Sequence, residues 1–463
     1  MKRILAIIAG VFGLIGSARA AERAPGDIER QGPPEKVCQL TGETDWQSGK
    51  PTQAKTLSRF GLEAADLGYP IEHNGKLILL FGDSWPTLQK PGTLVELPPN
   101  DAVGVVTAKT APIKATCLGM QIQTVTGETM RVNGQGPAMK IYQPATIVGP
   151  QAIQQGFFDV PSGGVSAGDG LYGFFWTDHC SKGHAIPHSP AEPLARPKNA
   201  DERCPETDAL NSIGRGVMAR SDDDGKTFHN PTAMPPGFVY SIAVNPAVEG
   251  APGDRSILIF GVPRYRASVP YLAAAPVESF SNPAEWRFFV GRDGDGNPEW
   301  VTSKQWTAGY ALKGPAAVNW HPPMGAPELF PDDGGNEACI GEFSVTWNAP
   351  LNKWLMLYNC HGIEARVADE PWGPWSKPTV ILSGKDDLQC KILMSPRGCG
   401  DRHDFWPSRR TGKDIVSGGL YAPFVLNRYT EAGKEANSAV ITWVLSTWNP
   451  YEVDVMRSTL QVR

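Results

Sequence analysis

The sequence has no long apolar run, no basic cluster and no Cys-x-x-Cys pair. Its first apolar run, residues 4–16, is too short to span a bilayer, and no later segment is a transmembrane candidate. Because 48 Asp and Glu outnumber 43 Lys and Arg, and no basic run could follow a phosphate backbone, nucleic acid is not expected as a partner. The missing Cys-x-x-Cys spacing disfavours zinc, and we predict no metal and no cofactor.

The amino terminus has the pattern of an export signal. Lys2 and Arg3 precede the apolar run, and Ala18-Arg19-Ala20 is a small-x-small cleavage site. We therefore predict cleavage after Ala20 and a periplasmic or secreted protein with no membrane attachment after cleavage. No cysteine follows the cleavage site, so a lipid anchor is not expected there.

The eight cysteines form an even set, which in an oxidising compartment predicts disulfides. Connectivity cannot be deduced from the sequence. Short loops in stretches without a core pattern favour Cys180 with Cys204 and Cys390 with Cys399. A metal site formed by Cys180 and the nearby histidines is the weaker alternative.

Helical patterning is scarce, whereas short β-rich segments bounded by Gly, Asn, Asp and Pro recur from about residue 55 onward. These segments predict five hairpins, at residues 69–81, 160–176, 240–261, 343–358 and 421–445. A third apolar strand follows each hairpin, at residues 104–109, 216–220, 270–274, 362–366 and 453–457. Five such units cannot bury both faces alone, and radial stacking would cover them.

We therefore predict an all-β protein with a five-bladed β-propeller, and a β-sandwich is the alternative fold. The expected organisation is a signal peptide at residues 1–20, an N-terminal extension at 21–54 and a catalytic propeller at 55–463. Closure of the ring needs an amino-terminal strand beside the last blade, for which residues 55–60 are the candidate.

An Asp box supports the propeller. Ser221 to Phe228 fit its S-x-D-x-G-x-T-F pattern, which folds a turn at the periphery of propeller blades. The motif says little about catalysis. The arginine triad and the Tyr and Glu pair of a sialidase cannot be assembled from the sequence, so a sialidase is not predicted.

The densest chemical signal is a pair of acids at the open end of the first hairpin. Asn74-Gly75 predicts a two-residue turn, and regular pairing from it would set Asp66 opposite Asp83. Opposed like charges destabilise a hairpin, so function is the simplest reason for the pair. Close carboxyls tend to separate their pKa values, which suits the acid and base of a glycosidase. The alternative is that Asp66 caps a turn and Asp83 ends a strand, each solvated.

Several separated motifs resemble one family of exported bacterial proteins, domain of unknown function 4185. They are Asp66-Leu-Gly, Phe81-Gly-Asp83-Ser84-Trp85, Arg264-Tyr-Arg266, Gly341-Glu342-Phe343-Ser344-Val345, Trp354-Leu-Met-Leu-Tyr358 and Tyr421-Ala-Pro423. The resemblance implies a five-bladed propeller related to glycoside hydrolase family 183, which cuts D-arabinan internally. It also implies that Asp66 and Asp83 are the acidic pair and that Glu342 matches a further acid of the family.

Other residues are candidates for binding or tuning. Glu342 begins an inner strand, where it could tune the pair or hold a sugar hydroxyl, or else be structural. Arg264 and Arg266 lie on one strand face and could bind hydroxyls or keep Asp83 ionised, with a salt-bridge network as the alternative. Trp85, beside Asp83, is the candidate sugar platform.

Three more residues complete the predicted binding set. Asp178 and His179 follow the second hairpin, and Tyr421 belongs to the last of the family motifs. The predicted function is an exported, endo-acting hydrolase of a D-arabinofuranose-containing polysaccharide, with that polysaccharide as its partner and the oligomeric state left open. The alternatives are a non-catalytic glycan-binding propeller and an envelope-assembly propeller.

Overall fold

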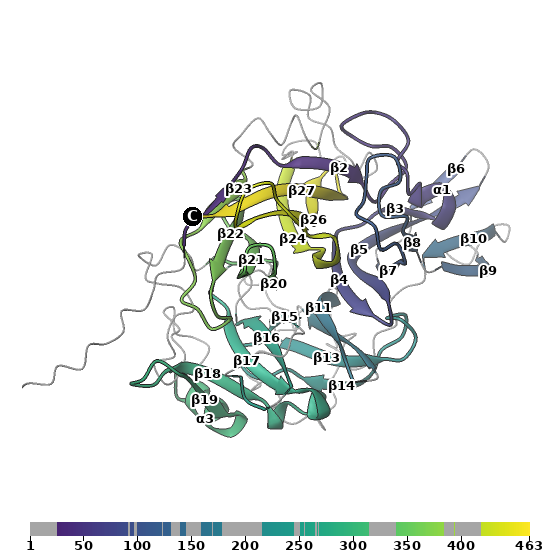
Figure 1. Cartoon of the computed structure of the whole chain (residues 1–463). Coiled ribbons are helices and arrows are strands. Elements are labelled where there is room, and N and C mark those ends of the chain that lie inside the picture. Colours follow the sequence, from purple (N-terminus) through teal and green to yellow (C-terminus); the bar gives the residue numbers. More distant parts are fainter. Residues whose placement is uncertain are drawn as a thin grey trace, which may run out of the picture.

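The computed structural model describes residues 26–90, 93–96, 100–122, 124–130, 139–144, 159–168, 170–177, 215–244, 251–253, 255–263, 266, 268–313, 339–383, 393 and 418–463. Strands dominate these ranges, and their sheets are arranged as five blades around one axis (Figure 1). The expected all-β, five-bladed propeller is confirmed.

Each blade starts with an inner strand, and the five inner strands contact one another in a closed ring. They are β4 (Leu67–His73), β11 (Asp159–Ala167), β15 (Tyr240–Val244), β20 (Phe343–Asn348) and β24 (Gly418–Val425). All of them run in the same direction through the ring because each blade repeats one antiparallel meander. Residues at the beginnings of the inner strands therefore share one face of the propeller, which we call the entry face.

The outer strands follow in sequence order. Blade 1 continues with β5 (Lys76–Lys90), β7 (Asn100–Val106) and β8 (Gln121–Ile122), and blade 2 with β12 (Gly170–Thr177), β13 (Arg215–Ser221) and β14 (His229–Ala233). Blade 3 adds β16 (Ser256–Val262), β17 (Tyr271–Pro276), β18 (Arg287–Arg292) and β19 (Pro298–Thr302). Blade 4 adds β21 (Lys353–Asn359), β22 (Ile363–Ala368) and β23 (Thr379–Leu382). Blade 5 adds β26 (Ser438–Asn449) and β27 (Glu452–Val462), with β25 (Glu431–Ala432) beside β26.

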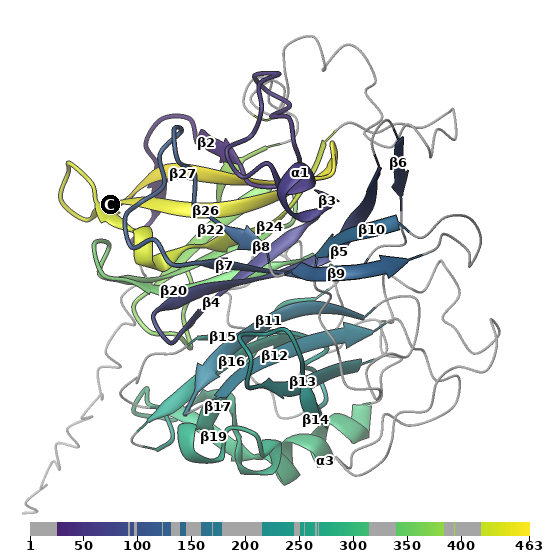
Figure 2. The same ribbon diagram turned by 90° about the vertical axis from the view of Figure 1, so that its right-hand side faces the viewer.

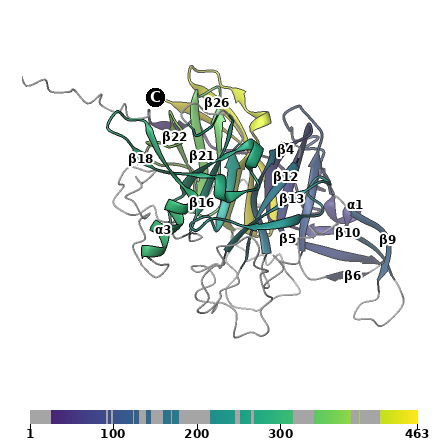
Figure 3. The ribbon, with the colours of Figure 1, turned by 90° about the horizontal axis from the view of Figure 1, so that it is seen from below.

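Short elements decorate this frame. Strand β5 runs past β4 on the entry face, where it pairs with β3 (Leu62–Ala64) and β6 (Thr93–Glu96), and β9 (Thr124–Met130) and β10 (Met139–Pro144) lie on the same side (Figure 2). Helix α3 (Ser303–Lys313) follows β19 at the rim of blade 3 (Figure 3). The 3-10 turns are η3 (Val277–Ser279), η4 (Pro283–Glu285) and η6 (Asn427–Tyr429).

All five predicted hairpins and their third strands are present. In the first hairpin His73 pairs with Lys76 and Ile71 with Ile78, as the Asn74-Gly75 turn predicts. The second hairpin turns one residue earlier than a copy of the first would, because Ala167 pairs with Gly170. The Asp box also forms, with Asp223 accepting hydrogen bonds from the backbone and hydroxyl of Thr227.

Apolar and polar contacts join neighbouring blades. Between blades 1 and 5 the ring of Tyr69 meets that of Phe424 edge to face, with centroids 5.0 Å apart. At the same seam the Leu67 amide donates to Ser446 Oγ over 2.8 Å. The largest hydrophobic cluster draws side chains from every blade, so the blades share one core.

The amino-terminal segment closes the ring. Strands β1 (Ile28–Arg30) and β2 (Glu35–Gln39) both pair with β27, so residues before 55 form the outer edge of blade 5. The expectation that residues 55–60 supply this strand is wrong, because they form helix α1 (Thr56–Phe60). The left-handed residues Lys55 and Gly61 bound this single turn and prevent an extended strand there.

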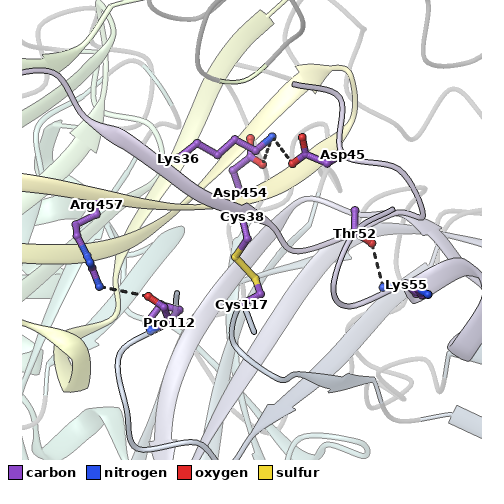
Figure 4. The surroundings of a disulfide bond; sticks show 9 residues. All are labelled: Lys36, Cys38, Asp45, Thr52, Lys55, Pro112, Cys117, Asp454 and Arg457. Carbon is purple, nitrogen blue, oxygen red and sulfur yellow. Dashed lines mark hydrogen bonds and ion pairs between the residues drawn. A yellow bond between two sulfur atoms is a disulfide. The ribbon is translucent and has the colours of Figure 1, made fainter. Parts of the chain in front are cut away.

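A buried charge cluster and a disulfide fasten this closing strand (Figure 4). Lys36 Nζ lies 2.9 Å from Asp454, 3.3 Å from Asp45 and 3.8 Å from Glu452. Cys38 is bonded to Cys117, which follows β7 in blade 1, with Cα atoms 5.7 Å apart. The disulfide therefore ties the edge of the last blade to the first blade.

A second disulfide, Cys339–Cys360, spans the ends of the first hairpin of blade 4, with Cα atoms 5.3 Å apart. These two disulfides support the prediction of disulfides as such. The predicted pairs Cys180 with Cys204 and Cys390 with Cys399 lie outside the described residues. Among the described helices, none is long and apolar enough to cross a membrane.

Candidate active site

A β-bulge directs Asp66 into the entry face. Regular pairing of β4 with β5 holds as far as Tyr69 and Leu80, after which Leu67 pairs with Phe81. Leu67 and Gly68 both have positive φ angles, of 61° and 78°. The bulge adds one residue to β4, so Asp66 lies opposite Gly82 and not opposite Asp83. The Gly82 amide donates a hydrogen bond to the Asp66 carbonyl over 3.2 Å. The predicted direct Asp66–Asp83 pairing is therefore wrong by one residue, because the bulge breaks the register.

Two tyrosines of blade 5 lie beside the Asp66 carboxyl. Tyr421, on β24, donates its hydroxyl to Asp66 Oδ2 over 2.9 Å. Tyr451, in the turn between β26 and β27, is buried beside the carboxyl and interacts with it electrostatically. Asp66 Oδ1 is buried against Gly82, where an added methyl group would approach it to 2.5 Å. Gly82 therefore makes room for the carboxyl.

This environment favours the protonated form of Asp66. Burial raises the pKa of its carboxyl well above the ordinary value, and the neighbouring charge of Asp83 raises it further. The hydroxyls of Tyr451 and Tyr421 lower the pKa by less, and Glu342 raises it slightly. Desolvation penalises a carboxylate more strongly than these two hydroxyls stabilise it, so the net shift is upward.

Asp83 has a partner that the sequence did not reveal. Asp83, on β5, pairs with Asp101 at the start of β7, and both residues are partly exposed. Directly paired residues have Cβ atoms ~5 Å apart, so two carboxyls meet on one strand pair. Extending the third strand of blade 1 backwards from residue 104 would have located Asp101. The site thus contains Asp66, Asp83 and Asp101 on blade 1.

Glu342 lies at the start of β20 in blade 4 and is only 2% exposed. Both of its carboxyl oxygens accept from Arg266 Nη2, at 3.1 and 3.3 Å. This ion pair matches the salt-bridge alternative for Arg266. The Arg266 guanidinium also lies 5.7 Å from the centroid of the Tyr421 ring, a cation–π contact. Blades 3, 4, 5 and 1 thus contribute Arg266, Glu342, Tyr421 and Asp66 to one connected group.

Strained backbone accompanies these residues. Leu67, Arg266 and Ala422 are non-glycine residues with left-handed φ angles of 61°, 54° and 53°. Each costs on the order of 1 kcal/mol and persists only where surrounding structure enforces it. Leu67 follows Asp66 and Ala422 follows Tyr421, so the strain falls where side chains of the group are aimed.

Trp85 is not an open platform for a sugar. Its ring is 6% exposed and packs in a small cluster with Ala64 and Tyr451. Pairing of Trp85 with Ala64, on the extra strand β3, covers it. The expectation for Trp85 is corrected accordingly, because its side chain packs with Tyr451 and Ala64 and leaves no open face for a sugar.

The other predicted site residues fall into those that the structure brings together and those outside the described ranges. The structure brings together Asp66, Asp83, Glu342, Arg266 and Tyr421. Asp178, His179 and Arg264 lie outside the described residues. Tyr451 was missed, because a tyrosine in a turn between the last two strands gives no signal of a contact to residue 66.

The arrangement places a carboxyl with a raised pKa, Asp66, near a second carboxyl, Asp83. A desolvated carboxyl that keeps its proton can protonate a leaving oxygen, and a neighbouring carboxylate can act as a base or nucleophile. The hydrogen bond from the Tyr421 hydroxyl fixes the orientation of the Asp66 carboxyl. In the described part of the chain, no group of carboxylates has the geometry of a metal site; the one grouping of possible ligands contains the bonded Cys339 and Cys360 with His361.

Several solved structures match the chain over most of its length, at low sequence identity. A proposed hydrolase from Bacteroides ovatus is 9% identical, with 86% of each chain covered and a TM-score of 0.48. An alpha-L-arabinofuranosidase from Podospora anserina is 10% identical, with 92% of this chain and 97% of that chain covered and a TM-score of 0.35. An exo-beta-1,3-galactanase from Phanerochaete chrysosporium is 7% identical, with coverages of 93% and 67% and a TM-score of 0.37. At these identities and TM-scores the likeness says nothing about the reaction.

No curated protein matches the chain in sequence. The family model described as Domain of unknown function (DUF4185) matches residues 215–457, which is more than half of the chain. This segment contains Arg266, Glu342, Tyr421 and Tyr451, whereas Asp66 and Asp83 precede it. The four later motifs of the sequence analysis lie within the matched segment, and the chain belongs to the DUF4185 family.

Proposed function

We propose that the protein is a glycoside hydrolase in which Asp66 is the general acid and Asp83 the base or nucleophile. The observation that carries the proposal is that Asp66, whose Oδ1 is buried and whose pKa is raised by desolvation, has Asp83 close enough for its charge to raise that pKa further. Environments that push two carboxyl pKa values apart mark acid and base assignments. Asp101, which pairs with Asp83, is the reserve candidate for the second role.

The proposed substrate is a neutral polysaccharide containing D-arabinofuranose, cleaved internally. Two observations support a neutral sugar. Asp83, Asp101 and Glu342 give the site an excess of acidic groups, and the one cation described there, Arg266, is already paired with Glu342. A uronic or sialic acid would meet repulsion. The choice of D-arabinan rests on the resemblance of the acid motifs to the family members that cut it.

The proposed location is outside the cytoplasm, either periplasmic or secreted. The two disulfides are of the kind that form in oxidising compartments. Cleavage after Ala20 is part of this proposal, and sequencing the amino terminus of protein recovered from the exporting host tests it.

Incubation with purified D-arabinan, L-arabinan and galactan, followed by oligosaccharide profiling, tests the activity. Wild-type protein should release oligosaccharides from D-arabinan. Asp66→Asn and Asp83→Asn should each lose at least ~100-fold in turnover, the low end for removal of a general acid or base. Asp295→Asn, in an exposed hairpin of blade 3, is the matched control and should retain full turnover.

Each other outcome has a defined meaning. Retention of more than a tenth of turnover by Asp83→Asn, with loss in Asp101→Asn, would transfer the second role to Asp101. Retention by Asp66→Asn would overturn the acid assignment. Binding of a glycan without release of any product would favour the glycan-binding propeller, since buried and ion-paired acids can also hold sugar hydroxyls.

A further inference from the structure

One large aromatic side chain on the entry face is exposed. Trp448, at the end of β26, has 59% of its surface exposed. Among the described residues, the other exposed large apolar side chains are Ile113 and Val380. Ile113 follows β7 in blade 1, and Val380 lies on β23 of blade 4. The three are on different blades, so they do not form one apolar patch of the kind that binds a protein partner.

The exposed indole is held in place. Its ring meets that of Tyr451 edge to face, with centroids 5.7 Å apart and planes at 82°. Gly419, across the sheet on β24, has a φ of 76°, and a methyl group there would approach Trp448 Cβ to 2.9 Å. Glycine at 419 therefore provides the space that the indole side chain needs. A ring with one packed neighbour and an open surface is preorganised for a flat ligand.

Tyr451 connects this indole to the proposed catalytic acid. Its ring packs against Trp448, and its buried hydroxyl interacts electrostatically with the Asp66 carboxyl. Trp448 is therefore one tyrosine ring away from the Asp66 carboxyl. A sugar lying on the indole would be next to, and not at, the bond that Asp66 protonates.

We propose that Trp448 is the stacking platform of a substrate subsite that holds the sugar unit adjacent to the cleaved bond. This proposal rests on the proposed function. The apolar face of an indole covers the C–H face of a neutral furanose or pyranose, and its N–H remains available to a ring hydroxyl. Trp448 is a specificity-determining residue here, since it does not touch the reacting atoms.

Chain length separates a subsite from a structural role. In Trp448→Ala, KM for D-arabinan oligosaccharides of five or six units should rise about 5- to 10-fold, while kcat changes little. Oligosaccharides too short to reach the subsite should show unchanged constants. Trp448→Phe should recover part of the affinity, and Val380→Ala, which removes exposed apolar surface from blade 4, should match wild type.

Binding is measured separately from hydrolysis in the Asp66→Asn background. D-arabinan hexasaccharide should shift the tryptophan fluorescence, and calorimetry should give its Kd. When Trp448→Ala is added, the Kd should rise about 5- to 10-fold and the fluorescence shift should become smaller. If no glycan is hydrolysed by the wild type but this difference in binding persists, the hydrolase proposal fails and the platform stands. Unchanged affinity, or an equal loss for short and long oligosaccharides, would overturn the platform.

Discussion

The hydroxyl of Tyr421 donates a 2.9 Å hydrogen bond to Asp66 Oδ2 across the seam between blades 5 and 1. The two residues are 355 positions apart in the chain. The contact exists only because the ring of blades closes, and it links the acidity of Asp66 to that closure.

The pH profile of kcat/KM should move in opposite directions in two variants. Tyr421→Phe removes a hydrogen bond that lowers the pKa of Asp66, so the alkaline limb, where the acid loses its proton, should move to higher pH. Glu342→Gln removes a negative charge that raises the same pKa, so the limb should move to lower pH. Asp295→Asn serves as the control with an unchanged profile. Shifts of the same sign would contradict the assignment of Asp66 as the acid.

Asp66→Asn should be at least as stable as the wild type near neutral pH. The folded-state pKa of Asp66 is raised above its unfolded value, so folding holds a proton that the unfolded chain releases. The contribution of Asp66 to stability is therefore fully present below its unfolded pKa and is lost as pH rises toward the folded pKa. Thermal unfolding across this range should show a weaker loss of Tm in Asp66→Asn. A Tm that is lower than wild type at every pH would contradict a destabilising buried carboxyl.

Lys36→Met should lower stability by about 3–5 kcal/mol, because it leaves buried acids without their cation. Glu452→Gln is the matched control. Burial and the nearby Asp454 raise the pKa of Glu452 well above its ordinary value, and burial raises that of Asp454 to about 6, so the pair retains a proton in the folded state. Glutamine copies the protonated glutamate, and its Tm should stay near wild type at neutral pH. Denaturant unfolding measures both, and an unchanged midpoint for Lys36→Met would contradict a stabilising role.

The two disulfides should differ in their effect on stability. The double variant Cys38→Ser/Cys117→Ser removes a disulfide between residues that are 79 positions apart. The double variant Cys339→Ser/Cys360→Ser removes a disulfide between residues that are 21 positions apart. The chain-entropy estimate makes the loss about 1 kcal/mol larger for the first pair. Limited proteolysis should also cut the amino-terminal segment sooner in the first variant, since that disulfide fastens the closing strand. Equal losses and equal cleavage would contradict this role.

The sequence by itself determined the blades. Alternating apolar residues between turn-forming pairs located all five hairpins, and Asn74-Gly75 determined the register of the first from His73 to Tyr69. These are local properties, because a strand of period two and a tight turn are specified by residues next to one another. The same local reasoning located Asp66 and Asp83 at one end of that hairpin.

Only the tertiary structure decided how the site is assembled and how the ring is closed. The bulge at Leu67-Gly68 depends on a left-handed leucine, whose backbone is held by Ser446 from blade 5. The closing strand buries Lys36 among Asp45, which is near it in sequence, and Glu452 and Asp454, which come from the last blade strand. The burial of Trp85, the exposure of Trp448 and the contacts of Tyr451 likewise depend on which blades become neighbours. Burial and long-range pairing arise from closure of the whole ring, so no local pattern encodes them.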